Sequence, residues 1–198
     1  MTERFRSPLS ETIWIRAEMA ECLAEADDLP AAMAEWERAV HEASITFGRL
    51  ESTTLWLRRR YTWSIGEAGD PSRAATLLTA LLAEAKELDD EYLFLVFEIR
   101  KSLAWWTGVT GDSATALREL SALLPAAYKR GDQDLDLRSV KYMLAYWSSI
   151  NGSIGDMSKR LQSVIEQMNH DLGPSHPVTR AARHELDARR HTPTEPLN

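Results

Sequence analysis

The pattern of apolar and polar residues along this chain repeats about every 40 residues. The segment Leu103–Asp112 (LAWWTGVTGD) has one relative 42 residues earlier, Tyr61–Asp70, and another 41 residues later, Leu144–Ser153. Each copy opens with a large residue, a small residue and an aromatic residue, and each ends in a turn that contains glycine. Self-similarity at a fixed period is typical of repeat arrays, whose units bury their apolar faces by stacking on their neighbours.

Each repeated unit is predicted to be a pair of helices, and no strand pattern competes with this interpretation. Asp70 with Pro71 is typical of a helix start, whereas Gly48 and Gly173 fall where helices should end. The first helices of the pairs are expected at about residues 10–26, 52–67, 92–109, 134–150 and 177–190. The second helices are expected at about residues 30–47, 71–88, 113–129 and 154–170.

A small residue followed four positions later by a large one marks the second helix in several units. The clearest examples are Ala74 with Leu78 and Ala116 with Leu120, which would let two helices cross closely. At the C-terminal end only the first half of a unit can be aligned, so a lone capping helix is predicted there. The expected parts are a tail at residues 1–9, one domain over 10–190 with repeats at 10–48, 52–88, 92–129 and 134–170 and a cap at 177–190, and a disordered tail at 191–198.

Composition narrows the classes of function. The 198 residues carry a formal net charge of −7, which argues against nucleic-acid binding through bulk electrostatics. The single cysteine, Cys22, excludes an internal disulfide and suits a reducing compartment. The N-terminus lacks the apolar core of a signal peptide, and no run approaches the roughly 18 apolar residues of a membrane span. We therefore expect a cytoplasmic protein that binds neither membranes nor nucleic acid.

Three features of the chain resemble tetratricopeptide repeat (TPR) proteins. They are Leu-Ala-aromatic-Trp followed by Gly-Asp at 103–112, the Ala116–Leu120 spacing, and the connector 172–179 (LGPSHPVT). The likeness is to bacterial TPR proteins of the longer repeat variety that is also found in kinesin light chains. It covers about residues 50–190 well and 10–48 weakly. It implies an all-α fold: a right-handed superhelical α-solenoid of about four stacked antiparallel helix pairs plus a C-terminal capping helix.

The resemblance also implies a partner-binding groove, because the first helices of TPR arrays line the concave face. Aligning the first helices of this chain places cations beside aromatic residues on that face. Such a surface suits a protein or peptide partner that offers acidic and apolar side chains. The alternative is that the aromatic residues form a buried seam between helices. The predicted groove residues are Arg59, Trp63, Lys101, Trp105, Tyr142, Tyr146 and His184.

A second row of the aligned first helices is basic in every unit. We expect these cations to pair with acidic residues of neighbouring helices and to hold the repeats in register, with little net energy. Trp106 and Trp147 share another row and are expected to be packing residues. The basic row consists of Arg16, Arg58, Arg100, Lys141 and Arg183.

No catalytic, metal or cofactor site is predicted. The five histidines lack the spacing of metal ligands on a helix face, and no glycine-rich phosphate loop or nucleophile elbow occurs. The expected function is that of a non-catalytic adaptor or scaffold that holds a protein or peptide in its groove. The alternative is a sensor that responds to a ligand or peptide and controls a partner protein.

Two further observations bear on the partner. TPR arrays of the kinesin-light-chain type commonly carry Asn one position before the Leu of the first helix, where it grips a peptide backbone. This chain has no Asn there, which puts a backbone clamp in doubt; the matching residues are Glu18, Arg60, Ser102, Met143 and Glu185. A homo-oligomer formed through exposed apolar residues is a third hypothesis, with Trp14, Phe94 and Leu95 as candidates.

Overall fold

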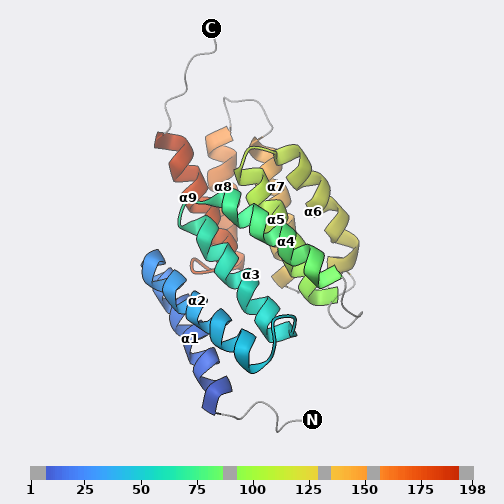
Figure 1. The fold of residues 1–198 in the computed structure, drawn as a ribbon. Coiled ribbons are helices and arrows are strands. Elements are labelled where there is room, and N and C mark those ends of the chain that lie inside the picture. The colour runs from blue at the N-terminus through green and yellow to red at the C-terminus, as the bar shows by residue number, and fades with distance from the viewer. Residues whose placement is uncertain (1–7, 87–92, 129–134, 151–156, 192–198) are drawn as a thin grey trace. The chain divides into compact units, whose positions relative to one another are not determined.

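A computed structural model describes residues 8–86, 93–128, 135–150 and 157–191, and within these ranges every regular element is an α-helix (Figure 1). The elements follow the predicted pairs closely. Because Pro71 and Pro177 stand at the first positions of α4 and α9, their missing backbone donors cost nothing there. The helices are α1 (Pro8–Glu25), α2 (Leu29–Thr46), α3 (Ser52–Glu67), α4 (Pro71–Lys86), α5 (Leu93–Val109), α6 (Ser113–Tyr128), α7 (Leu135–Ile150), α8 (Met157–Asp171) and α9 (Pro177–His191).

Aspartates start three of the second helices. The carboxylate of Asp28 accepts a hydrogen bond from the backbone N–H of Ala31 at 3.2 Å. Asp70 and Asp112 cap α4 and α6 in the same way, each at 3.0 Å. These caps satisfy backbone donors that a helix start leaves without an intrahelical partner. The Gly-Asp end of the repeated motif is therefore the turn between the two helices of a pair.

The chain divides into two compact units, residues 1–106 and 107–198, with the division inside α5. In the first unit α1 packs on α2, α2 on α3, and α3 on α4. In the second unit α6 packs on α7, α7 on α8, and α8 on α9. Consecutive helices are thus neighbours in both units, as an array of helix pairs requires. The single domain expected over residues 10–190 stays a prediction.

The core of the first unit lies between α1, α2 and α3. Ile13 and two alanines of α1 meet Trp36, Ala39 and Ala43 of α2, and Leu57 of α3 closes the cluster. The predicted small–large pairs are buried: Ala74 and Leu78 on α4 here, and Ala116 and Leu120 on α6 in the second unit. The small member of each pair lets the helices cross closely.

Two glycines inside first helices are faced by tryptophan rings. A Cβ added to Gly66 of α3 would come within 2.4 Å of the ring of Trp106 on α5. A Cβ added to Gly108 would come within 2.5 Å of the ring of Trp147 on α7. Both tryptophans are buried, so the prediction that they are packing residues is confirmed. Glycine is needed at these positions because any side chain would overlap a ring that cannot move away.

Candidate partner-binding site

Four of the seven predicted groove residues lie together in the first unit, and all four are buried. Trp63 and Trp105 are neighbours with ring centroids 6.4 Å apart, and Trp105 has no exposed surface. Arg59 and Lys101 are each only 7% exposed. The register that groups these side chains is therefore correct, but they face packed protein and not an open groove.

The two buried cations share one carboxylate. Nζ of Lys101 lies 2.5 Å from Oε1 of Glu98, and Nη2 of Arg59 lies 3.6 Å from Oε2 of the same residue. Nη1 of Arg59 also donates to the hydroxyl of Ser102 at 3.1 Å. Buried charges need such partners, because removing an unpaired charge from water is costly. This cluster ties α3 to α5.

The other three predicted residues lie in the second unit. Tyr146 is fully buried against Trp147, with ring centroids 5.0 Å apart. Tyr142 is half-buried and donates its hydroxyl to the carboxylate of Asp171. Burial, followed by this hydrogen bond, raises the pKa of Tyr142 to about 12. His184 is exposed on α9.

The structure thus differs from the expectation of an accessible row of aromatic and basic side chains. Trp63 and Trp105 are buried within the first unit and Tyr146 within the second, in agreement with the alternative interpretation that these aromatic residues are buried between helices. The physical reason is that large aromatic side chains lie where one first helix packs against the next, and burying them contributes more than leaving them in water. Direct contact of the seven residues with a partner stays a prediction.

The basic row behaves as expected where its partners can be seen. Arg16 of α1 bonds Glu35 and Glu42 of α2, each at 2.9 Å. Arg58 of α3 bonds Glu84 of α4 at 2.7 Å. Glu42 and Glu84 each stand 26 residues after their arginine, on the second helix of the same pair. The hydrogen bond from Arg58 is the main cause that lowers the pKa of Glu84. Ion pairs of the basic row therefore hold α1 in register with α2, and α3 with α4.

The helix α1 carries an exposed apolar surface that the sequence did not predict. We define the α1 face as Glu11, Trp14, Ile15, Glu18, Met19 and Cys22, which recur at the spacing of one helix side. Ile15 is 62% exposed, Met19 41% and Trp14 37%. Of the residues of the α1 face, only Trp14 was a predicted candidate for self-association.

The register shows why this exposure is unusual. The residues that align with Ile15 in the later first helices are Leu57, Ile99, Val140 and Ala182, and each of them is 0% exposed. Every later first helix therefore buries this row against its neighbours, whereas α1 leaves it open. Comparing the row across the repeats would have revealed the difference, but sequence alone does not say which edge is covered.

The described residues contain no group of three or more His, Cys, Asp or Glu side chains that could hold a metal ion. In the same ranges, no helix combines the length and apolar character needed to cross a membrane. Cys22 is exposed and forms no disulfide.

The solved structures similar to this chain include two of TPR-like repeat proteins. One is of a Podosopora anserina protein that is assigned as a kinesin light chain and has nearly identical TPR-like repeats; it is 19% identical with a TM-score of 0.62, and the match covers 92% of this chain and 86% of that one. The second is of a variant with the same description, 20% identical with a TM-score of 0.60, and the match covers 89% of this chain and 84% of that one. No protein-family model and no curated protein matches the sequence.

The likeness establishes the fold. The chain is an all-α, TPR-like solenoid of consecutive helix pairs, as the resemblance in the sequence predicted. Function itself depends on the surface that the scaffold presents.

Proposed function

We propose that this protein is a non-catalytic adaptor that binds a helical segment of a partner protein on the α1 face. The observation that carries the proposal is the difference between Ile15, which is 62% exposed, and its fully buried counterparts in the later repeats. A position that the array elsewhere reserves for helix–helix packing is open at α1. Exposed apolar surface of this kind marks interaction sites.

The gain available from covering this face is substantial. Burying a side chain such as isoleucine or methionine contributes about 1.5–3 kcal/mol each. Trp14 already contacts Trp56 of α3, with ring centroids 5.8 Å apart, so it forms a rigid border of the face. A partner that covers Ile15 and Met19 and leans on Trp14 gains both apolar burial and an aromatic anchor.

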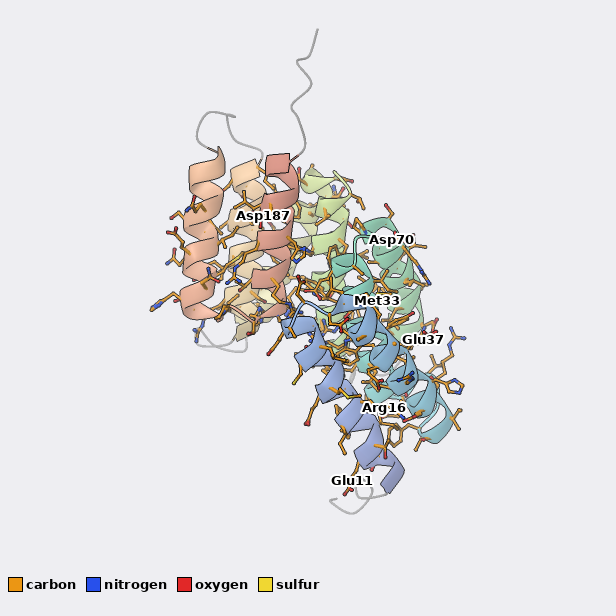
Figure 2. The ribbon with its side chains drawn as sticks, turned by 90° about the vertical axis from the view of Figure 1, so that its left-hand side faces the viewer. Glu11, Arg16, Met33, Glu37, Asp70 and Asp187 are labelled. Atoms are coloured by element: carbon orange, nitrogen blue, oxygen red, sulfur yellow. The ribbon has the colours of Figure 1, made fainter. Side chains whose placement is uncertain are left out.

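The charges on the α1 face indicate which charge the contacting residues of the partner should carry. Glu11 and Glu18 are exposed beside Ile15, and Figure 2 labels Glu11 near the start of α1. Glu18 aligns with Arg60 of α3, whose guanidinium contacts the carboxylate of Glu21 on α1. At this aligned position the charge is therefore negative on the exposed face of α1 and positive on α3. The partner helix should carry apolar residues flanked by Lys or Arg.

A photo-crosslinking amino acid at position 15 tests the proposal in the cell of origin. The matched control carries the same amino acid at position 37, where Glu37 is exposed on α2 (Figure 2). We expect one distinct protein to be crosslinked from position 15 and not from position 37. The purified partner should then bind the Ile15→Glu variant at least about tenfold more weakly than the unmodified chain, a change of about 1.4 kcal/mol.

Two results would overturn the proposal. Crosslinking of the chain to itself from position 15 would make α1 a self-association surface. Equal binding of the partner by the Ile15→Glu variant and the unmodified chain would show that the α1 face is not the site. Ile15 is suited to this test because an exposed residue can be changed with little effect on folding.

A further inference from the structure

The last two described helices enclose an open hollow of about 260 Å³. Its floor is apolar, formed by the buried side chains of Ile165 on α8 and Leu186 on α9. Its rim is charged, with one cation, Arg183, and two carboxylates, Glu166 and Asp187; Figure 2 labels Asp187 on α9. The volume is near the lower limit of small-molecule sites, about 300 Å³, and an apolar floor between charged groups suits the side chains of a docked amphipathic helix.

Arg183 belongs to the basic row, so its partner can be compared with those of the other arginines in the row. In the first two pairs the arginine of the first helix bonds a glutamate of the second helix 26 residues later, as Arg16 does with Glu42 and Arg58 with Glu84. Arg183 instead donates to the side-chain oxygen of Asn169 on α8. A second helix for α9 is not among the described residues, which end at His191. The guanidinium of Arg183 therefore contacts a neutral side chain, whereas those of Arg16 and Arg58 contact carboxylates.

In the first unit, the surface equivalent to this part of α9 is covered by another helix. Arg183, Leu186 and Asp187 of α9 align with Arg58, Tyr61 and Thr62 of α3, each 125 residues earlier. The helix α3 packs against α4, where Arg58 bonds Glu84, and Tyr61 packs against the core cluster of α1, α2 and α3. The helix α4 is therefore a template for what fits on α9.

The α4 template has a definite chemical pattern. Its buried residues are Ala74, Leu78, Leu81 and Ala85. Glu84 bonds Arg58 at one end of the pattern. Transferred to α9, a glutamate would meet Arg183. Asp187 stands one helical turn further along α9 and lines the same hollow, so a cation about one turn before the glutamate would face it.

We propose that the hollow between α8 and α9 receives an amphipathic helix of a partner protein. That helix carries a glutamate against Arg183, two or more leucines over Ile165 and Leu186, and an Arg or Lys against Asp187. The charges of hollow and helix are complementary at both ends, which fixes the direction of the helix as well as its presence. The proposal rests on the protein-binding function proposed above and adds a second surface, separate from the α1 face.

A labelled peptide of residues 70–86, which is the sequence of α4 with its cap Asp70, serves as the probe. It is titrated with the full chain and the bound fraction is followed by fluorescence anisotropy. We expect Arg183→Glu in the chain to weaken binding at least about tenfold, because it sets two carboxylates against each other. A peptide that carries Glu84→Arg should bind the Arg183→Glu chain and not the unmodified chain. This exchange of charges tests the contact even if either variant changes stability.

The matched control is Arg118→Glu, which reverses an exposed cation on α6 of the same unit and should leave peptide binding unchanged. The Ile15→Glu chain should also bind the peptide normally, so a failure of the α1 proposal is distinguishable from a failure of this one. Absence of peptide binding, equal binding by the Arg183→Glu chain, or no rescue by the exchanged charges would each overturn the proposal. Dimerisation of the chain that Arg183→Glu abolishes would make the occupant a second copy, which also overturns it.

Discussion

Replacing Gly66 by alanine tests the packing on which the repeat array depends. In an exposed helix the change would stabilise the protein by about 1 kcal/mol, because alanine has the higher helix propensity. Here the added Cβ would lie 2.4, 2.5 and 2.7 Å from three ring atoms of Trp106. Separations this short lie inside van der Waals contact, and the ring is rigid and buried.

The expected cost is large enough to reverse the helix-propensity gain. Overpacking costs about 1–3 kcal/mol, and the rigidity of an indole favours the upper end of that range. After the gain is subtracted we expect a net loss of about 2 kcal/mol in the free energy of unfolding. For a chain of this size that corresponds to a fall of about 4–8 °C in Tm. Urea denaturation followed by far-ultraviolet circular dichroism measures the first quantity, and a thermal scan measures the second.

A double-mutant cycle isolates the contact. In a Trp106→Leu background the indole is gone, so Gly66→Ala should become neutral or stabilise by up to about 1 kcal/mol. A difference between the two backgrounds is therefore the expected signature of the glycine–indole contact. If Gly66→Ala has the same effect in both backgrounds, or stabilises the otherwise unmodified chain, the reasoning is wrong.

Three other predictions follow from the same register. Leu57→Ala should cost about 2–5 kcal/mol of unfolding free energy, because Leu57 is fully buried. Ile15→Ala at the aligned position should change it by less than about 0.5 kcal/mol, because Ile15 is exposed. Equal losses in urea denaturation would refute the exposure of this row at α1. Because the pKa of Glu84 is lowered in the folded protein, its stabilisation is complete above the ordinary glutamate pKa and is lost as the pH falls through the lowered value. Glu84→Gln should therefore cost on the order of 0.5 kcal/mol at neutral pH and nothing in acid, and a pH-independent difference would contradict this. The phenol of Tyr142 should ionise with a pKa of about 12 in an ultraviolet titration. Its contribution to stability is therefore complete below the ordinary tyrosine pKa and is lost as the pH rises through about 12. Absence of this late step from the Tyr142→Phe variant provides the assignment.

The sequence alone determined the helices and their register. Local signals were sufficient, because a proline or an aspartate cap starts a helix through contacts within a few residues, and glycine at a positive φ, such as Gly69 and Gly111, ends one. The period then aligned the rows correctly, so the role of Arg58 as a tie between helices could be predicted before its partner Glu84 was seen.

Only the tertiary structure decided which rows are covered. Trp63 and Trp105 share a row in the 42-residue register, but their burial depends on how closely α3 and α5 approach each other. Ile15 and Leu57 likewise occupy one row and differ completely in exposure, because Leu57 has α1 and α2 to pack against and Ile15 has no such neighbour among the described residues. Exposure is a property of neighbours brought together by folding, and a repeat period, which makes the units alike, carries no information about where the stack is open.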